Sequence, residues 1–157
     1  MSQVIQREKI IEAVANSPEE TAATGRRFAR RLKTGDVTAF RGDLGSGKTL
    51  MIKAICAELN CAEVVSSPSF TILNVYQSAA EFPVYHFDFY RIESEAELTN
   101  LGLEEYFYDQ GICLIEWAEK VTSLLPLPRY EVNLRQPDGN PARRLIKIYR
   151  IFSDKEK

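Results

Sequence analysis

The chain has 157 residues, of which 45% are hydrophobic and 27% are charged. That length and composition predict one globular domain, residues 1–157, with a core of its own. Twenty basic against 22 acidic side chains give a net charge of −2, which excludes a polycation that coats nucleic acid. No apolar run is long enough for a membrane span, and the charged start of the chain is unlike a secretory signal. Three cysteines cannot all pair, which favours a reduced, cytoplasmic protein.

The first predicted element is a helix that begins at Ser17. Ser17 can cap the first turn, Pro18 suits the first helical position, and Glu20 completes a capping box. The apolar positions that follow at helical spacing, and predict one buried face, are Gly25, Phe28, Ala29 and Leu32. We expect Gly35 to end this helix. A short frayed head and the tail, residues 153–157, are expected to be the only loose ends of the chain.

A basic cluster falls opposite the apolar face of this helix. Its members are Arg26, Arg27, Arg30 and Arg31, and Lys33 extends it. Such a charge run is typical of a solvated helix face. The alternative is a docking patch for RNA phosphates or for an acidic partner. Because no aromatic side chains alternate with the arginines, we do not expect this chain to read a nucleic-acid sequence by itself.

A glycine-rich loop follows a short apolar strand predicted over Val37–Phe40. The loop matches the pattern G-x-x-x-x-G-K-[ST] in full, with Gly42, Asp43, Leu44, Gly45, Ser46, Gly47, Lys48 and Thr49. A helix is predicted directly after it, with apolar residues at Ile52, Ile55, Cys56 and Leu59. The loop therefore stands between a strand and a helix, which is the context that a phosphate-binding loop requires.

Each fixed residue type of this loop suits phosphate binding. Glycines let backbone N–H groups turn inward around phosphate oxygens, and the next helix directs its N-terminus at the same anion. Lys48 is expected to neutralise the β and γ phosphates of a nucleotide, and the Thr49 hydroxyl to hold Mg²⁺. A chance match in a glycine-rich turn is the alternative, and the flanking strand and helix disfavour it. The sequence predicts nucleotide binding.

Further strands and a short helical region are predicted downstream. Thr71–Gln77 and Pro83–Phe89 are rich in the β-branched and aromatic residues of strands. Ser94 and Glu97 form a second capping box, which begins a helical region that is broken at Gly102.

The last predicted strands decide the fold class. Residues 111–116 form an apolar run typical of the buried centre of a parallel sheet. Tyr130–Arg135 and Arg143–Ile151 flank a segment rich in turn residues and predict a hairpin. The sequence therefore predicts an α/β, three-layer, P-loop NTPase-like fold. Its central, mainly parallel sheet is flanked by helices and carries an antiparallel β extension.

Two carboxylates are candidates to complete a nucleotide site. Glu116 ends its strand at the carboxyl edge of the sheet, where ligands of open α/β sheets bind, and we expect it to contact Mg²⁺ or its water shell. A solvated glutamate is the alternative. Asp88 shares a strand face with His86 and Tyr90, and is expected to orient water or a metal-bound water. The alternative for Asp88 is a buried salt bridge, with Arg91 as the nearest cation in sequence.

Three features near these carboxylates stay open. His86, the one histidine of the chain, is either part of the site or a hydrogen-bonded support. The segment Ser66–Thr71 is either a switch loop that senses the γ-phosphate or a plain turn. Trp117 either stacks at the site or packs in the core.

Taken together, these segments resemble the TsaE (YjeE) family of bacterial P-loop ATPases. They occur in family order between Ser17 and Tyr149. The matching segments are Ser17–Thr21, Gly42–Thr49, Ser67–Thr71, His86–Arg91, Leu101–Tyr106 and Ile115–Lys120. Two departures are mild, since the family commonly has threonine where Ser69 and Leu50 stand.

The resemblance implies a role in making threonylcarbamoyladenosine in tRNAs that read codons beginning with A. It implies a Mg²⁺-dependent ATPase, slow alone, that docks on the TsaD–TsaB complex and supports its turnover, with any tRNA contact made through that complex. By motif, Lys48 and Thr49 would bind phosphate and Mg²⁺, Asp88 and Glu116 would serve metal and water, and Trp117 would lie beside the site. Ser67–Thr71 would be a mobile segment near the nucleotide.

Other functional classes share the glycine loop. A small-molecule kinase would add an arginine-bearing lid, for which Arg143 and Arg144 are candidates. A GTPase is disfavoured, because the chain lacks Asn-Lys-x-Asp and a downstream Asp-x-x-Gly. A non-catalytic, ATP-sensing adaptor would differ from the ATPase only in its rate of hydrolysis.

Overall fold

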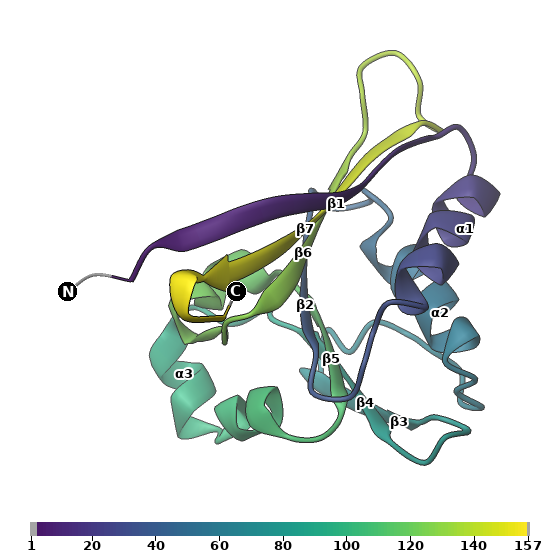
Figure 1. Ribbon diagram of the computed structural model, residues 1–157. Coiled ribbons are helices and arrows are strands. Elements are labelled where there is room, and N and C mark those ends of the chain that lie inside the picture. The colour runs from purple at the N-terminus through teal and green to yellow at the C-terminus, as the bar shows by residue number, and fades with distance from the viewer. Residues whose placement is uncertain (1–2, 157) are drawn as a thin grey trace.

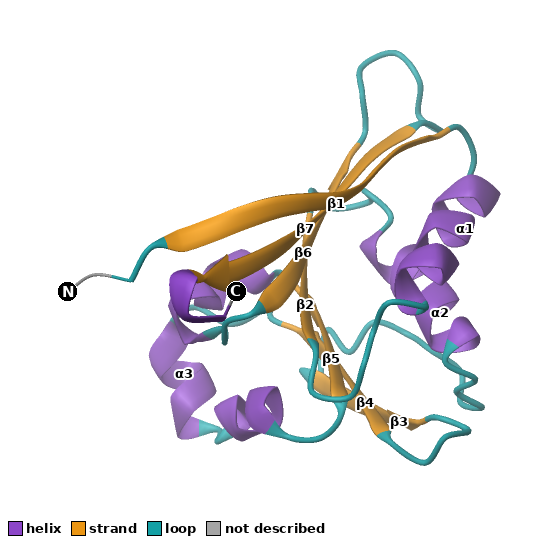
Figure 2. Cartoon of the chain, viewed as in Figure 1, coloured by secondary structure: helices purple, strands orange, loops and turns teal. Residues whose placement is uncertain are grey.

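A computed structural model describes residues 3–156, and across this range seven strands form one mixed sheet with helices on both faces (Figures 1 and 2). The elements in chain order are β1 (Ile5–Ala15), α1 (Pro18–Ala29), β2 (Val37–Arg41), α2 (Lys48–Glu58), β3 (Leu73–Gln77), β4 (Pro83–Asp88), α3 (Glu95–Asn100), η1 (Leu103–Tyr108), β5 (Ile112–Glu116), η2 (Ala118–Leu124), β6 (Arg129–Arg135), β7 (Arg144–Ser153) and η3 (Asp154–Glu156), where η marks a 3₁₀ helix. No helix in this range combines the length and apolar character needed to cross a membrane.

The sheet has a parallel centre and antiparallel edges. Its strand order is β1-β7-β6-β2-β5-β4-β3. The pairs β6–β2, β2–β5 and β5–β4 are parallel, whereas β1–β7, β7–β6 and β3–β4 are antiparallel. The predicted parallel centre and C-terminal antiparallel hairpin are confirmed. The carboxyl ends of β2, β5 and β4 meet at one edge, which places the glycine loop beside the ends of the strands that carry Asp88 and Glu116.

A strand, β1, lies ahead of α1 and was not predicted from the sequence. The head that was expected to be loose begins with residues 1–2, which lie outside the described residues. β1 pairs with β7 along its length, and a register shift between Lys9 and Ile11 interrupts the pairing. That irregularity breaks the two-residue alternation by which a strand is recognised in a sequence. The tail was expected to be loose from Ser153 onward, but Ser153 is the buried last residue of β7. The backbone N–H of the next residue, Asp154, donates to the carbonyl oxygen of Val4. Lys157 lies outside the described residues.

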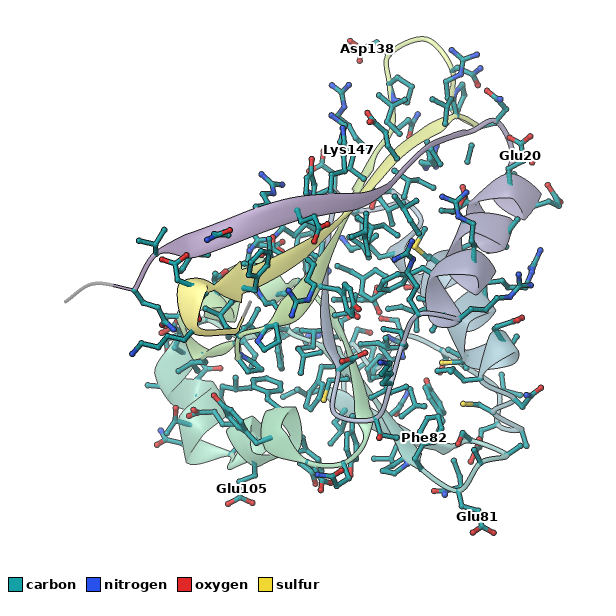
Figure 3. The ribbon with its side chains drawn as sticks, in the orientation of Figure 1. Glu20, Glu81, Phe82, Glu105, Asp138 and Lys147 are labelled. Atoms are coloured by element: carbon teal, nitrogen blue, oxygen red, sulfur yellow. The ribbon has the colours of Figure 1, made fainter. Side chains whose placement is uncertain are left out.

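Apolar side chains fill the space on both faces of the sheet (Figure 3). On the α1–α2 face the buried residues include Phe28, Ile52, Ile55, Leu114 and Ile148. On the α3 face they include Phe87, Phe89, Leu98, Phe107 and Ile115. Phe87 and Phe89 lie on the face opposite His86, as strand alternation predicts. The helices therefore cover both faces, which is the three-layer arrangement that was expected.

Two predictions about helix ends are wrong in detail. α1 ends at Ala29 rather than near Gly35, because the backbone N–H groups of Arg31 and Leu32 bond three residues back and tighten the chain into a turn. At α3 the capping box does not form. Ser94 is the N-cap residue, but the Glu97 N–H bonds to its carbonyl oxygen and not to its side chain.

The two N-cap serines give a matched test of capping. The Ser17 hydroxyl accepts a hydrogen bond from the Glu20 N–H at 3.2 Å, whereas the Ser94 side chain makes no capping bond. We expect Ser17→Ala to lower the free energy of unfolding by about 1 kcal/mol, since it leaves an N–H of the first turn without its partner. Ser94→Ala should change it by less than about 0.5 kcal/mol. Urea unfolding of both variants measures the difference, and equal effects would contradict the capping role of Ser17.

Candidate functional site

The glycine loop borders a cleft of about 570 Å³ at the carboxyl edge of the parallel strands. The loop enters from β2 and leaves into α2, so it is anchored at both ends by buried elements. Leu50, the residue after the loop, also lines the cleft. The other lining residues come from three segments between α2 and η2: Ser67, Ser69, Phe70, Asp88, Tyr90, Arg91, Glu116 and Trp117. The structure thus brings the predicted glycine loop, both predicted carboxylates and Trp117 to one cleft.

Two glycines are required for the shape of the loop. A Cβ atom on Gly42 would lie 2.7 Å from the Leu134 carbonyl oxygen of β6, a backbone atom that cannot easily move aside. Gly47 is the N-cap residue of α2 and has φ of +107°, a conformation that L side chains rarely adopt. The loop can therefore pass close to β6 and still turn sharply into α2.

The amine of Lys48 lies against its own loop. It donates hydrogen bonds to the carbonyl oxygens of Gly42 and, at 3.5 Å, Asp43. The same nitrogen lies 3.9 Å from the ring centroid of Trp117, a cation–π contact. Burial lowers the pKa of Lys48, and nearby carboxylates, led by Glu119 and then Glu116, act in the opposite direction. A phosphate in the cleft would give this buried cation the anionic partner that it lacks in the loop.

Glu116 and Thr49 are in direct contact. The Thr49 hydroxyl donates a hydrogen bond to Glu116 Oε1 at 2.8 Å. Glu116 ends β5 and is only 3% exposed, so the alternative of a solvated glutamate is wrong. The two residues proposed from sequence to hold Mg²⁺ therefore face each other across the cleft floor, although they are far apart in the chain.

Asp88 is the neighbour of Glu116 in the β4–β5 pair. Its two oxygens accept from the Ser67 hydroxyl at 2.5 Å and from the Tyr90 N–H at 2.9 Å. The described residues show no ion pair between Asp88 and Arg91, whose guanidinium instead lies 4.3 Å from the ring centroid of Phe70. The Ser67 hydroxyl also lies 3.3 Å from Glu116 Oε2, so it bridges the two carboxylates.

The oxygen atoms gathered here suit Mg²⁺. Hydroxyls of Thr49 and Ser67 and carboxylates of Asp88 and Glu116 form an all-oxygen donor set, which is the chemistry that this hard cation prefers. Magnesium sites also keep waters and substrate phosphates as ligands, so few protein oxygens are needed. The donor set of the cleft therefore fits the metal predicted from the sequence.

His86 and Tyr76 lie behind Glu116. His86 is fully buried, with Nε2 2.7 Å from Glu116 Oε2 and Nδ1 3.1 Å from the Tyr76 hydroxyl. Sequence reasoning left the role of His86 open and missed Tyr76. No local pattern marks Tyr76, because its contact with His86 depends on how β3 pairs with β4.

Arg144, which the kinase alternative would place in a lid, does not line the cleft. As a candidate lid arginine it would reach into the cleft, but it donates to the carbonyl oxygens of Ser46 at 2.8 Å and Gly45 at 3.1 Å. It thereby ties β7 to the glycine loop. Arg143 donates to Asn16 at 3.0 Å. Neither arginine forms a kinase-type lid.

The basic cluster on α1 is exposed to solvent. Arg26, Arg27, Arg30 and Arg31 all lie on the surface, opposite the buried Phe28 and Ala29. One member, Arg30, forms an ion pair with Glu58 of α2 at 3.0 Å. The placement agrees with a solvated helix face and leaves the docking alternative as a prediction.

Comparison with known proteins identifies the family. A family model described as "Threonylcarbamoyl adenosine biosynthesis protein TsaE" matches residues 15–145, which include every segment of the cleft. The chain belongs to the TsaE family. The resemblance seen in the sequence is therefore confirmed, and the family takes part in the biosynthesis of threonylcarbamoyladenosine in tRNA.

Individual TsaE proteins and one crystal structure agree with this assignment. The tRNA threonylcarbamoyladenosine biosynthesis protein TsaE of Bacillus subtilis (strain 168) is 42% identical over 120 residues, 76% of this chain and 74% of the relative. The protein of the same name from Treponema pallidum (strain Nichols) is 37% identical over 131 residues, 83% of this chain and 96% of the relative. The crystal structure of Bacillus subtilis YdiB has a TM-score of 0.70 and 30% identity, and the match covers 99% of this chain and 90% of that one.

Proposed function

We propose that this TsaE-family chain is the ATP-binding and ATP-hydrolysing component of tRNA threonylcarbamoyladenosine biosynthesis, on a P-loop NTPase-like fold. One observation carries the proposal. The Thr49 hydroxyl and the buried Glu116 carboxylate are hydrogen-bonded at 2.8 Å in the same cleft as the Lys48 amine. A phosphate-binding cation thus lies beside two oxygen ligands for a metal, the pairing that phosphoryl transfer needs.

In this proposal each side chain of the cleft has a separate role in binding or hydrolysing ATP. The glycine loop and Lys48 bind the β and γ phosphates of ATP, and Thr49 and Glu116 hold Mg²⁺. The metal, when bound, neutralises charge that develops on the transferred phosphoryl group. Asp88, fixed by Ser67 and the Tyr90 N–H, accepts a hydrogen bond from the attacking water and orients it. Trp117 covers the phosphate side of the cleft.

We also propose that the chain docks on the TsaD–TsaB complex and contacts tRNA only through it. The rim of the cleft carries apolar side chains that water surrounds, since Leu44 is 82% and Phe70 81% exposed. A partner that covers these side chains would exclude water from the cleft and raise the rate of hydrolysis. The three free cysteines suit a cytoplasmic location.

Hydrolysis of ATP and GTP with Mg²⁺, by the chain alone and with TsaD–TsaB, tests the proposal. We expect slow, ATP-selective hydrolysis that rises when the partner complex is added. Tight ATP binding with no hydrolysis in either state would instead support the ATP-sensing adaptor. Equal use of GTP would contradict the adenine preference, and a phosphorylated small molecule in the products would indicate a kinase.

A further inference from the structure

We infer that His86 and Tyr76 are positioning residues, which hold Glu116 in place for metal binding and join it to the Ser66–Thr71 segment. The inference rests on the proposed function, because it assigns a role toward the metal that Glu116 would bind. Neither His86 nor Tyr76 lines the cleft, and Glu116 lies between His86 and the cleft.

The contact between His86 and Glu116 fixes one oxygen of the carboxylate. An ionised carboxylate only accepts hydrogen bonds, so His86 Nε2 must carry the proton in the 2.7 Å contact with Oε2. The other oxygen, Oε1, faces Thr49 on the cleft side. His86 therefore holds the carboxylate by its buried oxygen and leaves the second oxygen directed at the position where metal would bind.

Tyr76 fixes the orientation of the His86 ring. Its hydroxyl lies 3.1 Å from Nδ1, on the side of the ring opposite Glu116. Both side chains are buried, with 3% exposure for Tyr76 and none for His86. A partner on the second ring nitrogen sets which nitrogen faces the carboxylate, and such outer partners tune metal-binding groups.

The same tyrosine reaches the segment that borders the cleft. The Tyr76 hydroxyl accepts a hydrogen bond from the Ser66 backbone N–H at 3.4 Å, and Asn74 donates to the Ser66 carbonyl oxygen at 3.1 Å. The next residue, Ser67, bonds to Asp88 and approaches Glu116. A closed ring of contacts thus runs from Ser66 through Tyr76 and His86 to Glu116 and returns through Ser67. Displacement of the segment would therefore disturb the carboxylate, and displacement of the carboxylate would disturb the segment.

Nucleotide binding with and without metal measures this role directly. Trp117 is the single tryptophan and lines the cleft, so its fluorescence can follow ADP binding in Mg²⁺ and in EDTA. The dissociation constant in EDTA divided by that in Mg²⁺ measures how much the metal strengthens ADP binding. We expect His86→Ala to reduce that ratio about tenfold, and Tyr76→Phe to reduce it by roughly threefold, while metal-free affinity changes less than about twofold. In the presence of Mg²⁺, turnover at saturating ATP should fall and KM for ATP should rise, each by similar factors.

Two further variants separate positioning from general damage to the fold. His86→Gln keeps an N–H that can reach Glu116, so it should recover part of the loss seen in His86→Ala. Tyr85→Phe is the matched control, because Tyr85 is a buried tyrosine of β4 whose hydroxyl donates to Asp109 and not to the cleft. Tyr85→Phe should leave the ratio of the two ADP dissociation constants unchanged. Urea unfolding checks that each variant is folded.

The outcomes are distinguishable. If the wild-type chain binds ADP equally well with and without Mg²⁺, the proposed metal site is wrong, and the positioning role is overturned with it. If wild-type binding depends on Mg²⁺ and Tyr76→Phe and His86→Gln both keep the full ratio, the positioning role alone is overturned. A reduced ratio in Tyr76→Phe with an unchanged ratio in Tyr85→Phe supports it, even if His86→Ala fails to fold.

Discussion

Replacing Lys48 with alanine is expected to weaken ATP binding by roughly 100-fold, the largest loss of affinity from any single substitution in this chain. Lys48 is the cation of the glycine loop, and it is 5% exposed, so water would not screen its contact with phosphate as it does at the surface. Hydrogen bonds to charged groups contribute about 1.5–3 kcal/mol each, which corresponds to about 10–150-fold in affinity.

Calorimetry is the measurement of choice for this variant. Lys48 contacts the Trp117 ring, so its removal would change the fluorescence of that tryptophan without any nucleotide. Lys53→Ala is the control, since Lys53 is an exposed lysine of the same helix that does not line the cleft. Near-normal ATP affinity in Lys48→Ala would contradict the assignment of a phosphate-binding loop.

Glu116→Gln is expected to lower turnover of ATP about 100–1,000-fold while the metal-free affinity for ATP changes less than about threefold. Glutamine keeps the volume of the side chain and an oxygen that can accept from Thr49, but it removes the negative charge. In the proposed mechanism that charge holds the metal during phosphoryl transfer, whereas metal-free ATP affinity comes from the loop and Lys48. The expected signature is a loss in kcat that is much larger than the rise in KM.

Steady-state hydrolysis with TsaD–TsaB present, together with ATP titration, checks this expectation. Glu105→Gln is the control, because Glu105 is an exposed glutamate of η1, on the side of the sheet away from α1 (Figure 3). Unchanged turnover in Glu116→Gln would remove Glu116 from the catalytic residues. An equal loss of ATP affinity and turnover would show that its charge acts in binding.

Local patterns of the sequence predicted the framework of the cleft well. The glycine loop between β2 and α2 follows from residue types at fixed spacing, because its conformation depends on glycines and a helix start within a few residues. Helical and strand periodicity likewise predicted α1, the strand that ends at Glu116 and the C-terminal hairpin. Glu116 could be chosen because it ends a predicted strand, and Asp88 because it shares a strand face with the polar residues His86 and Tyr90.

These local patterns did not predict the contacts between segments that lie far apart in the sequence. β1 was missed since its alternation is broken by the irregularity in its pairing with β7. The partners of His86 could not be named, because Tyr76 and Glu116 approach it only through the pairing of β3, β4 and β5. Arg144 was interpreted as a lid candidate, although β7 directs it to the back of the glycine loop.

The sequence by itself determined that a glycine loop of the phosphate-binding pattern stands between a strand and a helix, and that Asp88 and Glu116 are the candidate carboxylates. These features are local, since backbone conformation and periodicity are set by residues close together in the chain. Only the tertiary structure decided that Thr49 meets Glu116, that Ser67 bridges to Asp88, and that His86 supports Glu116 from behind. Those contacts depend on the order and register of strands, which bring together residues far apart in the sequence, and no spacing rule encodes them.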